Sequence, residues 1–328
     1  MSTVTNYLST TAARFGDGWN RFWYLPSHPL PAAVLRIGTG LIAFWMLLTL
    51  GFDLLRYFGP FGIVRVSMLE AIYPTDVSLR FSYLDFVQDS GTLQAVHYAG
   101  LAIVLAFTLG LWAPVTSILS LVVFLSYFHR GRMLTGVDEP VVAMLLFYLC
   151  FAPTGACLSL DAWLKRRRAN SASATCSSLC DAAPTYTATI GLRLIQVHLA
   201  LIYFMMFCAT LQYNAVWWNG TAVWWLIARP ESALVDLRWL YQYPYLINFW
   251  TTSLIFFYLA FALLIWNRHA RPLLVAISAI VWTGTAILTG LIPFCAAMFV
   301  AGLAFISAEQ WKSLGCCKAE PAMPKAAA

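Results

Sequence analysis

Charged residues are scarce in this sequence. Of its 328 residues only 10% are Asp, Glu, Lys or Arg, whereas 61% are hydrophobic and the mean hydropathy is +0.72. A soluble globular domain carries about 25% charged residues, most of them on its surface. The shortage of charge therefore excludes an ordinary water-soluble fold and indicates an integral membrane protein.

Alternating hydrophobic patterns and common enzyme motifs are also missing. The apolar runs are continuous, which excludes a transmembrane β-barrel, whose strands alternate. There is no P-loop, GxSxG or HExxH motif and no glycine-rich dinucleotide loop. No His-x3-His or Glu-x2-His pair offers a helical metal site, so we predict no metal. The net charge of +6 is spread over loops, so we predict no nucleic-acid partner.

What the sequence does contain is a series of long apolar runs. A helix that crosses a membrane needs about 20 mostly apolar residues. The runs predict an all-α, polytopic membrane bundle of about eight transmembrane helices, with interfacial helices on the outer face. Tight turns are expected near Trp112–Pro114 and between Gly290 and Pro293. The predicted spans are 32–52, 94–111, 113–128, 138–158, 188–211, 246–266, 271–290 and 291–309.

Arginine and lysine in short loops predict the orientation, because they concentrate on the cytoplasmic side. The densest basic run is Lys165–Arg168, and Arg268, Arg271 and Lys312 fall on the same side of the predicted topology. We therefore predict that both termini are cytoplasmic and that the protein lies in a plasma or inner membrane.

The chain is predicted to form one membrane domain with two extensions. Residues 1–31 are a cytoplasmic or interfacial segment, residues 32–309 the transmembrane domain, and residues 310–328 a disordered cytoplasmic tail. A linker rich in small residues is predicted at 164–187, within the domain.

Two outer segments are expected to form short helices. The loop 53–93 has too many aromatic residues to be a free linker, and we expect short helices on the outer face of the bundle. The segment 215–228, "AVWWNGTAVWWLIA", is too short to span, and its tryptophans predict an interfacial or re-entrant helix.

Polar residues cluster just before the fourth predicted span. The stretch "FHRGRMLTGVDEPVV" holds His129, Arg130, Arg132, Asp138 and Glu139. On one interpretation Asp138 simply lies at a helix N-terminus, where a carboxylate accepts backbone N–H bonds. On the other, the group forms the mouth of an outward cavity that holds a polar substrate or relays a proton.

Two arginines lie inside predicted spans, Arg36 in the first and Arg193 in the fifth. Ionisable groups in a membrane are costly and are candidates for function. Both arginines can reach toward the interface or bind carbonyl groups. Alternatively, they bind an anionic or polar headgroup.

Three stretches carry a family resemblance. They are "RFWYLPSHPLPAAVLRIGTGLIAFW" (21–45), "SYFHRGRMLTGVDEPVVAMLLFYLCFAPTGACLSLDAW" (126–163) and "RLIQVHLALIYF" with "WWNGTAVWW" (193–225). Together they resemble the HTTM (horizontally transferred transmembrane) family, whose membrane domain is shared with vitamin K-dependent γ-carboxylase. The resemblance covers about residues 20 to 310 and rests on the order and spacing of the stretches.

The resemblance implies a catalytic base that this chain lacks. The family's characterised member uses oxygen and a reduced quinone, and its base is a lysine just before the elbow that Trp217 and Gly220 match. Ala209 and Thr210 stand at that place here, so we do not expect glutamate carboxylation. The lysines of the chain, all on the predicted cytoplasmic side, are Lys165, Lys312, Lys318 and Lys325.

Two functions are predicted. The first is binding of a lipid- or quinone-like ligand in an outward-facing intramembrane cavity; bilayer lipids are then partners, and a quinone is the candidate cofactor. The second is a membrane-embedded redox or acid–base enzyme, with Asp138 or Glu139 as base and His129 beside them. A transporter is less favoured, because no inverted repeat is seen. The ligand-binding candidates are Arg130, Arg132, Tyr213, Asn214, Trp217, Asn219, Arg36 and Arg193.

Overall fold

The structure is a computed structural model of the chain. It describes residues 2–72, 81–87, 89–170, 182–212, 215–228 and 235–313. Tyr213 and Asn214, the centre of the predicted linker and most of the predicted tail lie outside these residues.

Every named element of the described residues is a helix, which confirms the all-α prediction for that part of the chain. One isolated bridge pairs Ser27 with Thr185. The α-helices are α1 (Ser2–Tyr24), α2 (Leu30–Phe52), α3 (Leu54–Phe58), α4 (Val66–Ile72), α5 (Ser90–Leu109), α6 (Ala113–Arg130), α7 (Asp138–Leu149), α8 (Leu160–Asn170), α9 (Tyr186–Gln212), α10 (Ala215–Trp218), α11 (Ala222–Ile227), α12 (Pro244–Leu264), α13 (Arg271–Thr289), α14 (Ile292–Gly302) and α15 (Ala308–Ser313). The 3-10 helices are η2 (Tyr83–Phe86), η3 (Arg238–Gln242) and η4 (Leu303–Phe305).

Among the described residues, six helices are long and apolar enough to cross a membrane: α2, α5, α6, α9, α12 and α13. They coincide with six predicted spans and are consistent with an integral membrane protein. The other two predicted spans, 138–158 and 291–309, contain α7 and α14, which have 12 and 11 residues. A helix of that length extends about 18 Å, less than the roughly 30 Å of a bilayer core. The count of eight therefore remains a prediction.

Proline and glycine explain why α7 and α14 are short. α7 ends at Leu149, ahead of Pro153 and Gly155, and a proline cannot continue a helix. α14 has Pro293 in its first turn and follows Gly290, whose φ of 67° suits a left-handed helix end. The structure thus confirms the predicted turn between α13 and α14, as it does the predicted turn between α5 and α6.

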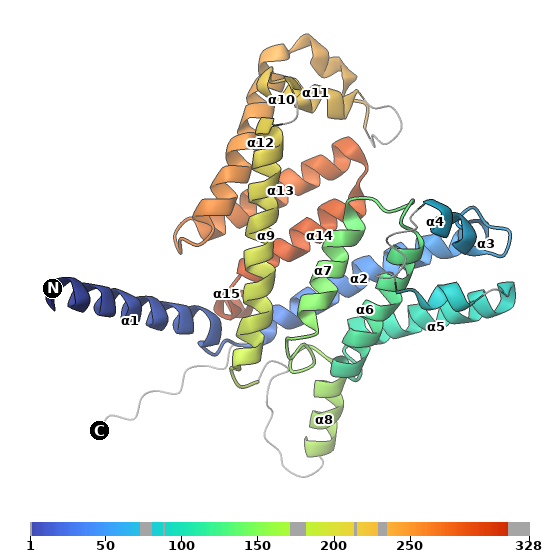
Figure 1. Cartoon of the computed structure of the whole chain (residues 1–328), viewed down its shortest axis with the longest axis horizontal. Coiled ribbons are helices and arrows are strands. Elements are labelled where there is room, and N and C mark those ends of the chain that lie inside the picture. The colour runs from blue at the N-terminus through green and yellow to red at the C-terminus, as the bar shows by residue number, and fades with distance from the viewer. Residues whose placement is uncertain are drawn as a thin grey trace.

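The two short helices lie at the centre of the bundle. α7 packs against α2, α6, α9 and α14, and α14 packs against α2, α9 and α13 as well. Figure 1 shows α7 and α14 between the longer helices α9 and α2. Their inward side chains are fully buried, as for Leu145 in α7 and Met298 in α14. At Gly38 of α2, a Cβ would lie 2.8 Å from Val300 of α14, so a larger residue there would force Val300 to shift.

The helices define two ends of the bundle. We call the end with α8, α15 and the starts of α2, α9 and α13 the basic end, and the end with α3, α4, α10, α11 and η3 the elbow end (Figure 1). Described carboxylates at the basic end are Asp17, Asp161 and Glu309. Described arginines and lysines at the basic end are Arg14, Arg21, Arg36, Lys165, Arg166, Arg167, Arg168, Arg193, Arg268, Arg271 and Lys312.

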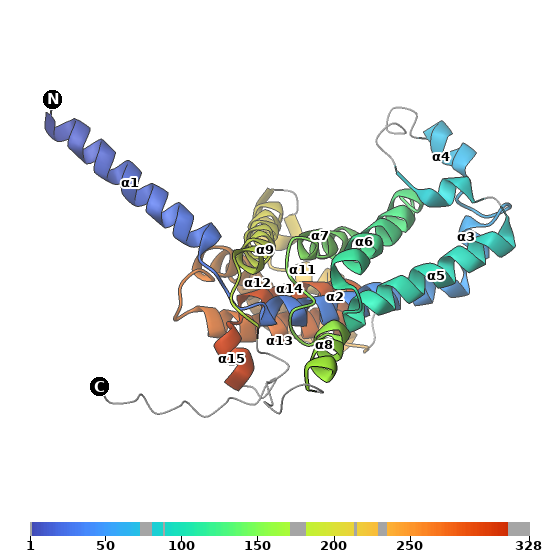
Figure 2. The ribbon, with the colours of Figure 1, turned by 90° about the horizontal axis from the view of Figure 1, so that it is seen from below.

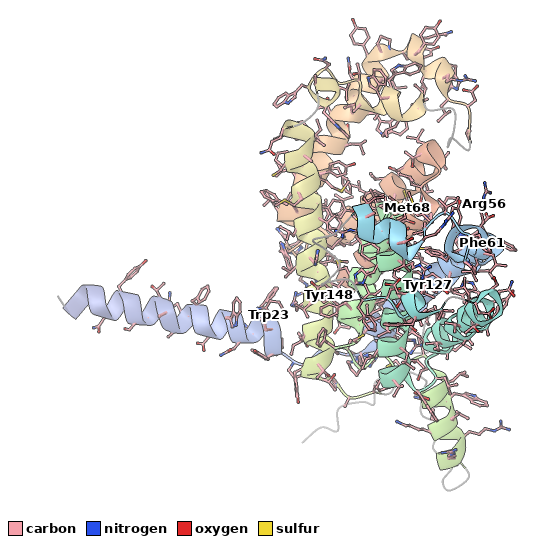
Figure 3. The ribbon with its side chains drawn as sticks, turned by 45° about the vertical axis from the view of Figure 1, so that its right-hand side comes forward. Trp23, Arg56, Phe61, Met68, Tyr127 and Tyr148 are labelled. Atoms are coloured by element: carbon pink, nitrogen blue, oxygen red, sulfur yellow. The ribbon has the colours of Figure 1, made fainter. Side chains whose placement is uncertain are left out.

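Two helices at the basic end project from the bundle. α1 extends away from the other helices in both views (Figures 1 and 2), with Trp23 close to the point where it joins them (Figure 3). α8 carries the basic run Lys165–Arg168 and continues through Asn170, into the segment predicted as a linker. Its Asp161 in the first turn and its arginines in the last turn both favour a helix.

Candidate functional site

A cavity of about 310 Å³ opens at the elbow end between α2, α6 and the first turn of α7. Its walls are mainly apolar side chains of α2 and α6, such as Leu50 and Phe128. Pro293, in the first turn of α14, also lines it. The starts of both short helices therefore border one cavity, which we call the acidic cavity.

Two carboxylates line the acidic cavity, Asp138 and Glu139, and both are half-buried. α7 begins at Asp138, and no side-chain hydrogen bond caps its start. The Glu139 Oε2 accepts a 2.7 Å hydrogen bond from the backbone N–H of Gly136. Burial raises the pKa of Glu139 above its usual range, and the charge of Asp138 raises it further. Glu139 therefore keeps a proton more readily than an exposed glutamate does.

A tyrosine–histidine pair lies behind the same wall. Tyr127 of α6 lines the cavity and is 6% exposed, and its hydroxyl lies 2.8 Å from Nδ1 of His97 in α5. Figure 3 shows Tyr127 within the bundle. His97 is buried, and its Nε2 has no hydrogen-bond partner among the described residues. The pair can hold or pass a proton next to the cavity. The sequence gives no signal for it, because the two residues are thirty positions apart on neighbouring helices.

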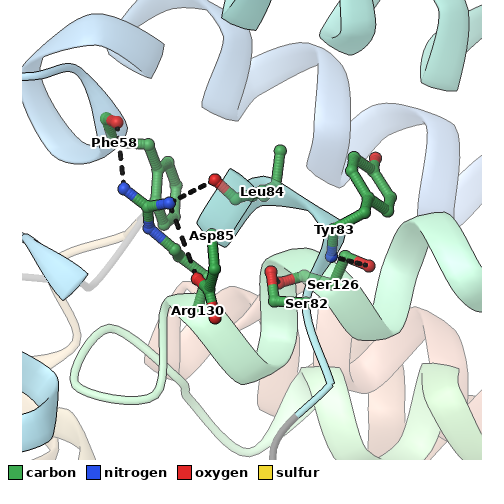
Figure 4. Close-up of polar contacts among 7 residues, drawn as sticks. All are labelled: Phe58, Ser82, Tyr83, Leu84, Asp85, Ser126 and Arg130. Carbon is green, nitrogen blue, oxygen red and sulfur yellow. Dashed lines mark hydrogen bonds and ion pairs between the residues drawn. The ribbon is translucent and has the colours of Figure 1, made fainter. Parts of the chain in front are cut away.

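Arg130 connects α6 to η2 and to the end of α3, as Figure 4 shows. It is 4% exposed, and its guanidinium donates to the carbonyl oxygens of Leu84 and Phe58 and lies 3.6 Å from the Asp85 carboxylate. Beside Arg130, the Ser82 hydroxyl donates to the backbone carbonyl of Ser126 over 2.9 Å. Arg130 borders a separate cavity of about 300 Å³ that shares Phe58 with the acidic cavity.

The remaining polar candidates lie apart from the acidic cavity. His129 Nδ1 lies 2.8 Å from the carbonyl oxygen of Phe81, and Arg132 is exposed. Arg36 is fully buried at the basic end and donates to the carbonyl oxygens of Thr154 and Leu158. This contact matches the carbonyl-binding interpretation of Arg36.

Arg193 joins α1 to α9 at the basic end. Its Nε donates to the carbonyl oxygen of Phe22 over 3.2 Å, and its Nη1 donates to Gln196 Oε1 over 2.9 Å. The guanidinium also lies 4.4 Å from the centre of the Phe22 ring. Arg193 therefore has a structural role, and two of its nitrogens are already engaged.

The aromatic elbow after α9 forms a structure of its own. Trp218 Nε1 donates to the Leu211 carbonyl over 2.8 Å, and Gly220, with φ 71°, lies against Asn248 of α12. Trp217 packs on the core, and Asn219 lines a third cavity of about 330 Å³. None of these elbow residues lines the acidic cavity.

The position that matches the family's lysine carries no base. Thr210 is 5% exposed and its hydroxyl donates to the Phe207 carbonyl over 2.6 Å. The described lysines, Lys165 in α8 and Lys312 in α15, both lie at the basic end. Lys318 and Lys325 lie outside the described residues.

Comparisons with models of protein families, with curated proteins and with solved structures find no match for this chain. The likeness to the HTTM family therefore rests on the three quoted stretches alone.

Proposed function

We propose that this chain is a membrane protein of the HTTM type that binds a lipid- or quinone-like molecule in the acidic cavity. The observation that supports this most is the combination of mainly apolar walls with a few polar side chains. Asp138, Glu139, Tyr127, Thr49 and Thr135 line a space of about 310 Å³ whose remaining walls are apolar. Small-molecule sites in proteins have this character and begin near this volume.

The charge of the cavity favours a neutral headgroup. The Asp138 carboxylate repels a phosphate, so an ordinary phospholipid headgroup is disfavoured. A protonated Glu139 donates a hydrogen bond, and such a donor suits the carbonyl or hydroxyl oxygen of a ring. Arg130 of α6 is engaged by two carbonyls and Asp85. We therefore expect a neutral ring with oxygen substituents in the cavity and an apolar tail among the helices.

Orientation is part of the proposal. We place the basic end in the cytoplasm, since it carries the Lys165–Arg168 run and few carboxylates. The acidic cavity then opens on the outer side. A reporter enzyme that is active only in the cytoplasm, fused after Lys312, is expected to be active; activity only of a periplasmic or luminal reporter would reverse the orientation.

Ligand binding is tested with two leucines of α2. Leu50 lines the acidic cavity, and Leu48, on the same helix, is 37% exposed and does not line it. The full chain is purified, its bound lipids are extracted and identified by mass spectrometry, and its unfolding temperature is measured with and without a short-tailed benzoquinone. The native chain should yield a quinone or a neutral-headed lipid and should gain stability with added ligand.

Leu50→Trp fills the cavity and should abolish both signals, whereas Leu48→Trp should keep them. If extraction yields only the bulk membrane lipids and benzoquinone shifts neither protein, the acidic cavity is not a ligand site. Equal loss of the extracted lipid and of the stability gain in both variants would place the ligand elsewhere on α2.

A second candidate function is acid–base or redox catalysis on the bound molecule. The raised pKa of Glu139 and the nearby Tyr127–His97 pair support it. In that reaction a bound quinol transfers two electrons and two protons to oxygen, giving quinone and hydrogen peroxide. Glu139 accepts a proton from a quinol hydroxyl and passes it to the reduced oxygen. Oxygen uptake with a reduced quinone should then occur with the native chain and be lost in Glu139→Gln. No uptake above that of empty vesicles would exclude the enzyme and leave the binding proposal intact.

A further inference from the structure

A fourth cavity, larger than the acidic one, lies at the opposite end of the bundle. It measures about 590 Å³ and runs between α13, the end of α14 with η4, and α15. Its walls are apolar, with Val275 and Ala279 on α13 and Phe299 and Leu303 facing them. Arg271, the first residue of α13, is its charged member. We call this site the arginine groove.

The groove can hold part of an acyl chain and is open to the surrounding lipid. Arg271, Val275 and Ala279 recur every four residues on one face of α13, so the wall extends about 12 Å from the helix start. Of the six spanning helices α13 has the smallest buried share, 28%. This helix therefore presents more of its surface to surrounding lipid than the other five do.

Three arginines lie close together where the groove begins. The charge of Arg271 repels that of Arg193 on one side and that of Arg268 on the other. Among the described residues, none of the three forms an ion pair with a carboxylate. Arg271 donates from Nε to the Ile265 carbonyl over 3.3 Å, and no described group bonds to its two terminal nitrogens. Arg268 is exposed.

This arrangement is incomplete without an anion. Cations that repel one another gain from a shared negative charge between them, and the fork of an arginine matches a phosphate. Arg271 lies at the end of a spanning helix, which is the depth of lipid phosphates in a bilayer. Basic pockets between helices at this depth suit acidic lipid headgroups.

We propose that the arginine groove binds one anionic phospholipid, with its phosphate held by Arg271 and Arg268 and an acyl chain lying along Val275 and Ala279. The site differs from the acidic cavity in location and in the charge of its ligand, so it stands independently of the proposed function.

The test uses the full chain in nanodiscs of phosphatidylcholine and phosphatidylglycerol in equal amounts. After transfer to mild detergent, native mass spectrometry counts the lipids retained per chain. The native chain is expected to retain one phosphatidylglycerol in preference to phosphatidylcholine. The double variant Arg271→Gln, Arg268→Gln should retain about tenfold less, the effect of losing charge-assisted hydrogen bonds.

A matched control separates the site from general attraction to a basic surface. Arg166→Gln with Arg168→Gln removes the same charge from α8 at the same end, outside the groove. This control should retain the lipid as the native chain does. Equal retention by the groove variant, or equal loss in the α8 control, would overturn the proposal.

A third variant leaves all charges in place. Ala279→Trp fills the apolar part of the groove and should also abolish retention, and it covers the case in which the arginine variants fail to fold. Glycerol phosphate at millimolar concentration, which has the headgroup without the chains, should not displace the lipid. Full retention by Ala279→Trp, or displacement by glycerol phosphate, would show that the acyl chain does not lie in the groove.

Discussion

The acidic cavity and the arginine groove differ in charge although their walls are built from the same kinds of side chain. Leu50 and Phe128 line the first, and Leu303 and Phe299 line the second. Two half-buried carboxylates, Asp138 and Glu139, line the acidic cavity, and Arg130 of α6 is bound to carbonyls. In the groove no described carboxylate pairs with the arginines. The polar residues at the rim, and not the apolar walls, therefore distinguish the two cavities.

The largest expected effect on stability comes from removing Arg130, the buried cation at the elbow end. Arg130→Met removes the guanidinium that contacts two carbonyl oxygens and the Asp85 carboxylate. Breaking one side of a buried ion pair costs about 3–5 kcal/mol, so the unfolding free energy should fall by an amount of that order. Denaturant unfolding in detergent measures it.

Arg56→Met is the matched control for Arg130. Arg56 lies at the same end, is 69% exposed in its side chain and lies 3.8 Å from Asp53. Exposed pairs contribute up to about 1 kcal/mol, so this variant should unfold nearly as the native chain does. Similar losses of unfolding free energy in both variants would mean that the buried contacts of Arg130 contribute no more than an exposed ion pair does.

The next largest effect is a pH dependence of stability and of ligand affinity at the acidic cavity. Because folding raises the pKa of Glu139, this side chain holds its proton more tightly in the folded protein than in the unfolded protein. The contribution of that proton to stability is complete below the ordinary pKa of a glutamate and is lost as the pH rises through the raised value. Affinity for a benzoquinone should likewise be highest at low pH, where Glu139 donates, and should fall over that window.

Glu139→Gln provides the control for the pH effect, because glutamine donates at every pH. Its benzoquinone affinity should not change across the window in which the native affinity falls. Lipid retention in the arginine groove should show no such dependence in either protein. A native affinity that is flat with pH would contradict the role of Glu139.

The helix pattern could be read from the sequence because it is a local property. Apolar runs of sufficient length gave the six spans, and glycine with proline placed the turns at Trp112 and Gly290. The short length of α7 was also readable, since Pro153 and Gly155 interrupt its run. Apolar character alone had suggested a longer helix.

The partners of the polar residues could not be read from the sequence, because they come from distant parts of the chain. Arg36 binds carbonyls more than a hundred residues away, and Arg130 binds a carbonyl on a different helix. A backbone carbonyl carries no signature in the sequence. For the same reason the sequence grouped His129 and Arg130 with the carboxylates of α7, whereas in the structure both hold the preceding loop.

The smallest effect compares two tyrosine–histidine pairs with the same distance between hydroxyl and ring nitrogen. Tyr127 lies 2.8 Å from His97 beside the acidic cavity, and Tyr148 lies 2.8 Å from His198 between α7 and α9, away from it. Figure 3 labels both tyrosines. Each change to phenylalanine removes one hydrogen bond and should lower the unfolding free energy by about 1 kcal/mol. Tyr127→Phe should in addition weaken benzoquinone binding about fivefold, as a lost hydrogen bond to the ligand does. Tyr148→Phe should leave the affinity unchanged, so equal affinities in the two variants would remove the Tyr127 hydroxyl from the binding site.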